Sequence, residues 1–141
     1  MFRTEFFSEV KASGLNIKKL KNFTSCAVKA LKLKSSVNII LTDAKGIKKL
    51  NRRFFSKTGL TDVIAFDLGK EEPFTEKLCE VFVCLPAARK AALSMGHGVV
   101  KELEILIAHG LLHLSGMDDA TGAAKKKMLD EGNALVEKLN K

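Results

Sequence analysis

The sequence predicts a single domain of the α/β or α+β class, with three or four strands and about five helices. Its 141 residues are 46% hydrophobic and include only two prolines, which is enough chain for one domain with a full core. Short β-branched segments alternate with longer segments of helical hydrophobic spacing, and these are long enough for crossover connections. We therefore expect residues 1–141 to form one domain.

The first half of the chain predicts two helices separated by one strand. Residues 1–14 fit either a short edge strand or the start of a helix, so their type stays open. Asn16 is expected to cap a helix that runs to about Lys32. Residues 35–42 are β-branched and predict a strand. Asp43 is then expected to cap a second helix, which continues through Phe54.

The second half predicts two strands followed by three helices. The strands are residues 61–68 and 78–85, and the second is apolar on both faces, which is typical of the interior of a sheet. Pro86 is expected to open a short helix that ends near Gly96. Residues 99–114 predict a central helix that is apolar enough to be buried, and residues 123–138 predict a last helix.

The sequence gives no sign of a membrane span, a secretory signal or a set of disulfides. No apolar run is long enough to span a membrane, and the first residues do not resemble a secretory signal. We therefore expect a cytoplasmic protein without a membrane partner. Cys26, Cys79 and Cys84 are odd in number and show no C-x-x-C spacing, so we expect buried free thiols and no disulfide framework.

Positive charge is concentrated in the first half of the chain. The net charge is +8; residues 1–60 carry 14 Lys and Arg against three acidic residues, whereas residues 61–141 carry 10 against 13. Such an imbalance is typical of a polyanion-binding surface, although a solvated lysine-rich face would look the same. The residues that form this candidate polyanion-binding surface are a basic ridge on and after the second helix: Lys48, Lys49, Arg52, Arg53 and Lys57.

The run HGLLHLSGMDD at residues 109–119 predicts a metal site. His109 and His113 are four residues apart, so on a helix they lie on one face about one turn apart. Gly116 can end the helix in a left-handed turn and bring Asp118 and Asp119 back toward them. Two imidazoles and one carboxylate are the protein ligands of an open, hydrolytic zinc site.

Two other interpretations of the histidines are weaker. The spacing also occurs in metzincin-like zinc proteases, but these carry a glutamate general base directly after the first histidine, where this chain has Gly110. His97 lies between two glycines at the start of the central helix, and we expect it to be a loop residue, not a ligand.

Three separated motifs resemble the YbeY family of bacterial metal-dependent endoribonucleases and rRNA maturation factors. HGLLHLSGMDD resembles the family signature H-G-x-L-H-L-x-G-Y-D-H, and LNRRFFSKTGLTDVIAF and CEVFVCLPAARKAA resemble two further family segments in order and spacing. The resemblance covers roughly residues 35–140. It implies a mixed sheet flanked by helices, hence an α+β domain, one zinc ion on the central helix, and processing of ribosomal small-subunit RNA, with no DNA partner.

The resemblance also assigns roles and raises an alternative. His109 and His113 match the first two family histidines, and Asp119 falls on the third; the carboxylate of Asp118 is then a candidate general base or a hydrogen-bond partner of a ligand. Phe55 stands where the family has an arginine. Because Phe55 and Asp119 weaken the chemistry, the alternative is a ribosome-associated RNA-binding factor with impaired catalysis.

Overall fold

Four strands form one mixed sheet. The structure is a computed structural model and describes residues 3–55, 63–69, 78–117 and 121–140. The strands are β1 (Thr4–Ser8), β2 (Ser36–Thr42), β3 (Val63–Gly69) and β4 (Leu78–Cys84), in the spatial order β1-β2-β4-β3. β1, β2 and β4 are parallel, and β3 runs antiparallel to β4. The expected α+β class with a mixed sheet is therefore confirmed.

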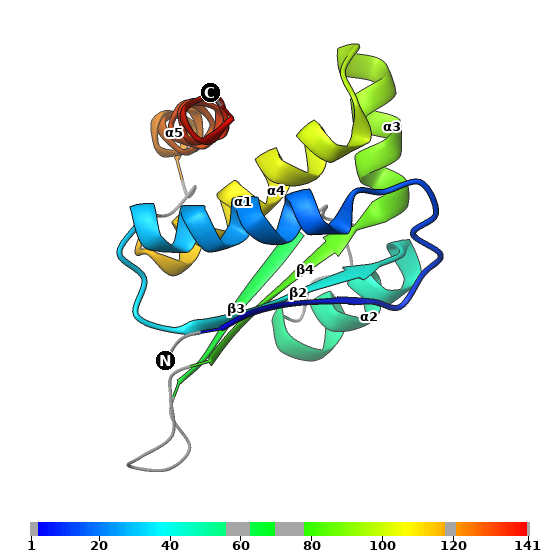
Figure 1. Ribbon diagram of the computed structural model, residues 1–141. Coiled ribbons are helices and arrows are strands. Elements are labelled where there is room, and N and C mark those ends of the chain that lie inside the picture. The colour runs from blue at the N-terminus through cyan, green and yellow to red at the C-terminus, as the bar shows by residue number, and fades with distance from the viewer. Residues whose placement is uncertain (1–2, 56–62, 70–77, 118–120, 141) are drawn as a thin grey trace.

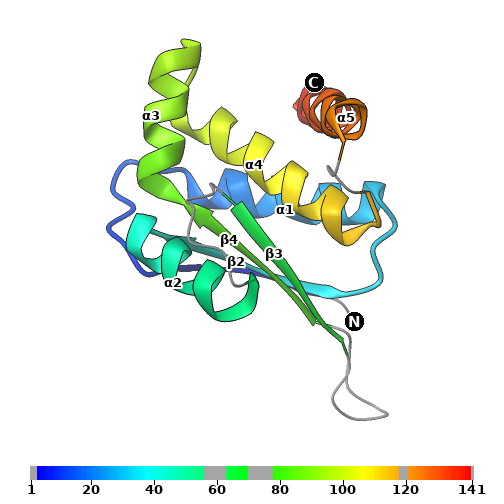
Figure 2. The same ribbon diagram turned by 180° about the vertical axis from the view of Figure 1, so that it is seen from behind.

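Five helices lie on the two faces of this sheet in the described part of the chain. They are α1 (Ile17–Ala30), α2 (Ala44–Phe55), α3 (Leu85–Met95), α4 (Val99–Leu114) and α5 (Gly122–Leu139). Figure 1 shows α1 and α4 over one face, α5 beyond them, and α2 alone on the other face; Figure 2 shows the same layers from behind. None of the helices described is both long and apolar enough to cross a membrane.

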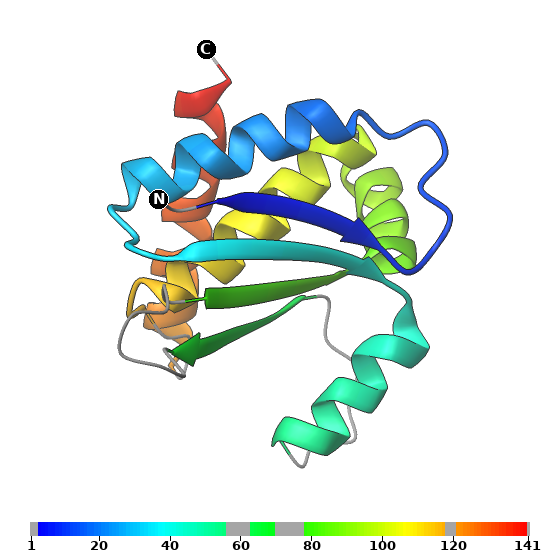
Figure 3. The ribbon, with the colours of Figure 1, turned by 60° about the horizontal axis from the view of Figure 1, so that its bottom comes forward.

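The alternation of side chains along the strands builds two cores of unequal size. The larger core joins β2 and β4 to α1 and α4, and its fully buried members include Ile39, Val81 and Leu103. The smaller core lies on the α2 side and contains Ile47 and Cys84. β4 is apolar on both faces and lies between β2 and β3, as its sequence predicted. Figure 3 shows the strands side by side, with α2 apart from the other helices.

The helices α1 and α2 begin directly after residues whose side chains cap them. The Asn16 carboxamide oxygen accepts a hydrogen bond from the Lys19 backbone N–H at 3.0 Å, and the Asp43 carboxylate accepts one from the Gly46 N–H at 2.8 Å. α3 ends at Gly96, whose φ of +74° is left-handed. The predicted N-caps are therefore confirmed.

Two expectations need correction or completion. Residues 4–8, whose type the sequence left open, form an edge strand because they pair in parallel with β2, from Thr4 opposite Val37 onward. Cys79 and Cys84 are buried, as expected, but Cys26 is exposed. It is exposed because it lies two residues after the buried Thr24, on nearly the opposite side of α1.

Candidate functional site

The candidate site lies on α4, the helix that most of the domain packs around. α4 contacts β3 and β4 below it, α5 above it, and α1 and α3 on its sides. Leu103, Ile107 and Leu111 are fully buried against the sheet. The helix begins at Val99 and ends at Leu114, which are the bounds that the sequence predicted. Because α4 is packed on several sides, the backbone from which its side chains project is held in place.

Gly110 lets α4 lie close to the sheet. A Cβ atom at this position would lie 2.9 Å from the Val81 Cγ1 atom and 3.5 Å from the Val63 Cγ2 atom. Val81 is fully buried and β-branched, so it has little freedom to move away. The residue after His109 is thus a glycine because the helix backbone touches β4 there, and this contact fixes the height of His109 above the sheet.

His109 and His113 lie next to each other on the more open side of α4. Their ring centroids are 5.5 Å apart and their planes meet at 82°. Glu104, nine residues before His113, points toward α1 and α5, where it meets Lys19 and Asn140. Nine residues are about two and a half helical turns, so His113 lies on the side of α4 away from Glu104.

The structure corrects one part of the sequence interpretation. The central helix was expected to be apolar enough to be buried. α4 is indeed buried along Leu103, Ile107 and Leu111, but His109 is only partly buried and His113 is exposed. The two imidazoles are therefore accessible to an ion or a substrate from outside the core.

The chain reverses direction directly after the histidines. The Met117 N–H donates to the Leu112 carbonyl and the Gly116 N–H donates to the His113 carbonyl, both at 3.1 Å, which is the Schellman pattern of helix termination. Gly116 has a φ of +110°, as its predicted role requires. Asp118 and Asp119 come next, and both lie outside the described residues.

The described residues supply two metal ligands. Adjacent, accessible imidazoles one helical turn apart are the ligand type and spacing that suit a zinc ion. Within the described ranges, no three His, Cys, Asp or Glu side chains form a group that could hold a metal ion. The pair fits a metal, and the third ligand expected from the sequence, Asp119, stays a prediction.

The helix α2, which carries four of the five residues of the predicted basic ridge, lies on the other face of the sheet (Figure 1). Lys48 and Lys49 are exposed on α2, Arg52 and Arg53 belong to the same helix, and Lys57 lies outside the described residues. α2 packs below β3 and β4 through Ile47, whereas α4 packs above the same two strands (Figure 3). α2 and the histidine pair of α4 therefore lie on opposite faces of the part of the sheet formed by β3 and β4.

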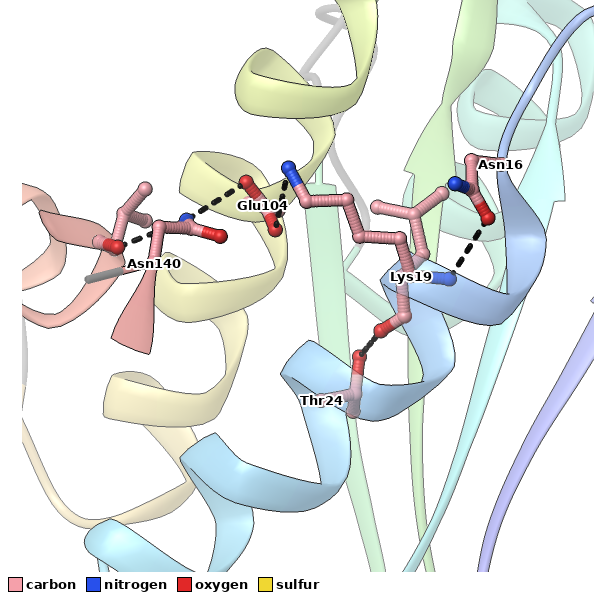
Figure 4. A network of polar contacts seen from close by, with 7 residues as sticks. Asn16, Lys19, Thr24, Glu104 and Asn140 are labelled. Atoms are coloured by element: carbon pink, nitrogen blue, oxygen red, sulfur yellow. Dashed lines mark hydrogen bonds and ion pairs between the residues drawn. The ribbon is translucent and has the colours of Figure 1, made fainter. Parts of the chain in front are cut away.

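Two further ionisable clusters lie away from the histidine pair. His97 Nε2 lies 2.8 Å from the Glu102 Oε1 atom at the start of α4, so His97 has a carboxylate partner of its own. Glu104 is 1% exposed; its Oε1 accepts a hydrogen bond from the Asn140 amide at 3.1 Å, and its Oε2 lies 4.0 Å from Lys19 Nζ (Figure 4).

Burial dominates the electrostatics of Glu104, which the sequence interpretation missed. Desolvation raises the pKa of the Glu104 carboxyl, while Lys19 and the Asn140 amide act to lower it. Its position was a usable signal, because Glu104 follows Val100 by four residues and precedes Ile107 by three, which places it within the apolar stripe of the helix.

The comparisons with known proteins agree with this geometry. The chain matches the family model described as endoribonuclease YbeY across residues 7–140. The chain belongs to the YbeY family. A protein named endoribonuclease YbeY from Elusimicrobium minutum (strain Pei191) is 38% identical over 112 residues, which are 75% of this chain and 76% of that protein. The protein of the same name from Aquifex aeolicus (strain VF5) is 31% identical over 125 residues, covering 87% and 83%.

A solved structure shares the fold. The solution structure of TM1509 from Thermotoga maritima has a TM-score of 0.64 and 30% identity, and the match covers 96% of this chain and 88% of that chain. The YbeY match begins well before residue 35, where the sequence resemblance was first evident, and so includes the end of β1 and all of α1. The family prediction is confirmed.

Proposed function

We propose that this protein is a metal-dependent endoribonuclease that acts in the cytoplasm on ribosomal small-subunit RNA during ribosome maturation. The observation that carries the proposal is the accessible pair His109 and His113 on the central helix of a YbeY-family domain. Its relatives bear the name endoribonuclease YbeY. The charge of the first half supports a polyanionic substrate.

The metal would be one zinc ion held by His109, His113 and Asp119. When bound, it would supply Lewis-acid chemistry toward a phosphodiester. Asp118 would either accept a proton or hold a ligand imidazole in orientation through a hydrogen bond. The close approach of Gly110 to Val81 supports this assignment, because it fixes the position of the backbone next to His109, the first proposed ligand.

The basic ridge would hold the RNA without reading its sequence. Lys48, Lys49, Arg52, Arg53 and Lys57 would contact phosphates, which positions a strand but carries no sequence information. Because α2 and α4 both pack on β3 and β4, RNA in contact with both would pass around the β3 edge. A zinc protease is disfavoured, since position 110, where such enzymes carry their glutamate general base, is a glycine.

Metal content and RNA cleavage test the proposal together. The purified protein is expected to hold about one zinc ion and to cleave a small-subunit rRNA transcript, and His113→Ala is expected to lose both the metal and at least about 100-fold of the activity. Elemental analysis and a gel assay of the transcript measure these quantities. His97→Gln is the matched control, because His97 lies on the opposite end of the α4 region and pairs with Glu102.

The outcomes separate the endoribonuclease from the alternative. Zinc-loaded protein that leaves the transcript intact, with His113→Ala behaving in the same way, would contradict catalysis. If that protein still bound the transcript in a salt-dependent manner, the RNA-binding factor with impaired catalysis, suggested by Phe55 and Asp119, would be the better description.

A further inference from the structure

The outer face of α1 carries an exposed polar stripe. Lys18, Asn22, Ser25 and Lys29 recur at helical spacing on the side of α1 opposite its buried residues, and all four are exposed. Lys32 follows directly, and its backbone N–H donates to the Lys29 carbonyl at 3.1 Å. We call these five residues the α1 stripe.

The lysines of the α1 stripe have no acidic partners in the part of the chain that the structure describes. α1 itself contains no Asp or Glu. Two neighbouring lysines are engaged elsewhere: Lys19 Nζ lies 4.0 Å from the Glu104 carboxylate, and Lys21 Nζ lies 3.8 Å from that of Glu5. The unneutralised charge of α1 is therefore concentrated on the stripe.

Two lysines of the stripe occupy positions that the helix itself does not favour. Lys18 is in the first turn, where the helix dipole is positive and disfavours a cation. Lys32 has a φ of +56° and occupies the left-handed position of a Schellman turn, in which the Leu33 N–H donates to the Val28 carbonyl. Glycine is the favoured residue there. Positions that break a local rule in this way are typical of functional surfaces.

The side chains of the α1 stripe match the chemistry of a phosphate backbone. Lysine, asparagine and serine are among the side chains that contact phosphate and sugar oxygens in nucleic-acid complexes. The stripe has no large apolar residue, whereas a helix that binds a membrane surface inserts one face of them. The centre of a protein interface is rich in aromatic residues and poor in lysine. RNA is therefore the partner that the stripe fits best.

We propose that the α1 stripe is a second RNA-binding surface, remote from the histidine pair, which holds the sugar-phosphate backbone of a long or folded substrate. The proposal rests on the proposed function. α1 lies on the Glu104 side of α4, opposite to His113, and on the other face of the sheet from α2 (Figures 1 and 4). Only an RNA large enough to extend around the domain can reach the α1 stripe while it occupies the histidine pair.

A charge-removal variant with a matched control tests this surface. The variant Lys18→Gln/Lys29→Gln/Lys32→Gln removes three charges from the α1 stripe, and Lys125→Gln/Lys126→Gln/Lys127→Gln removes three exposed charges from α5. Binding of a small-subunit rRNA transcript and of a short single-stranded oligoribonucleotide is measured by fluorescence anisotropy over a series of salt concentrations. Cleavage of both RNAs gives kcat and KM.

The α1 variant is expected to bind the transcript roughly tenfold more weakly. A plot of the logarithm of the association constant against the logarithm of the salt concentration should have a slope whose magnitude is smaller by about 2. KM for the transcript rises by the same factor, while kcat and all values for the oligonucleotide stay unchanged. Equal effects of the α1 and α5 variants would overturn the proposal, as would equally tight, α1-dependent binding to anionic phospholipid vesicles. If the wild type bound RNA through the α1 stripe without cleaving it, the proposed function would fail while this inference stood.

Discussion

Glu104 places a carboxylate where three helices meet. It is buried on α4, bonded to Asn140 of α5, and its second oxygen has no hydrogen-bond partner among the described residues, with Lys19 of α1 4.0 Å away. Such an incompletely paired buried charge is costly in its ionised form, which is why burial raises its pKa. The contacts to Lys19 of α1 and Asn140 of α5 favour the ionised carboxylate, but burial outweighs them and the pKa is raised.

Glu104→Gln is expected to change how stability depends on pH. Because the folded protein holds the Glu104 proton more tightly than the unfolded chain, this group stabilises the fold fully below its unfolded pKa, near 4.5, and loses that contribution as the pH rises through the folded pKa. The free energy of unfolding of Glu104→Gln, relative to wild type, should therefore be higher at pH 7 than at pH 4. Urea unfolding at several pH values measures it.

Glu5→Gln is the control for that measurement. Glu5 also faces a lysine, Lys21, but both side chains are about half exposed, and exposed pairs contribute little. A pH-independent difference between Glu104→Gln and wild type would show that Glu104 has the same proton affinity in the folded and unfolded states, against the expectation.

At the scale of the helices and strands, the sequence predicted those features that depend on neighbouring residues, such as the ends of a helix. α4 lies within the predicted bounds because Gly98 and Gly116 flank its apolar stripe. The type of β1 could not be predicted, because its strand conformation depends on pairing Thr4 with Val37, far along the chain. The exposure of His113 was missed for a similar reason: the helical spacing was known, but the elements that cover α4 were not.

The same helix offers a pair of glycines for a matched stability test. Gly110→Ala is expected to lower the free energy of unfolding by about 1 kcal/mol, since overpacking against Val81 outweighs the better helix propensity of alanine. Gly132→Ala on α5 should raise it by about 0.5 to 1 kcal/mol, because the added Cβ would meet only Leu112 and Ala108, at 3.8 Å or more. Urea unfolding compares the two variants.

The sign of the two changes is the decisive result. If Gly110→Ala were as stabilising as Gly132→Ala, then α4 would not be seated against β4 as closely as the structure shows. The zinc content of the two purified variants gives a second comparison. If Gly110→Ala lost the proposed zinc and Gly132→Ala kept it, the close contact between Gly110 and β4 would also be needed to position His109.

At the scale of the whole molecule, the hydrophobic core of the described residues does not involve the histidine pair. Its buried members come from the sheet, α1, α3, α4 and α5, and neither His109 nor His113 is among them. A metal at the histidine pair would therefore add to an existing fold and would not create it, in contrast to small zinc domains that fold only around their ion.

Removal of the metal is accordingly expected to leave the protein folded. After treatment with a chelator, the far-UV circular dichroism should keep its helical signal, and the thermal midpoint should fall by roughly 10 °C if the free metal had been about 100-fold above its Kd. His113→Ala should show the lower midpoint with or without the chelator. Collapse of the helical signal on chelation would contradict the metal-independent core.

The order of the elements along the chain also determines when the site can exist during synthesis. All four strands of the sheet come from residues 4–84, whereas α4, which covers the sheet and carries both histidines, spans Val99–Leu114. A nascent chain that has completed its sheet still lacks the helix that packs against Val81. Neither the covered sheet nor the histidine pair can therefore form until about four-fifths of the chain has left the ribosome.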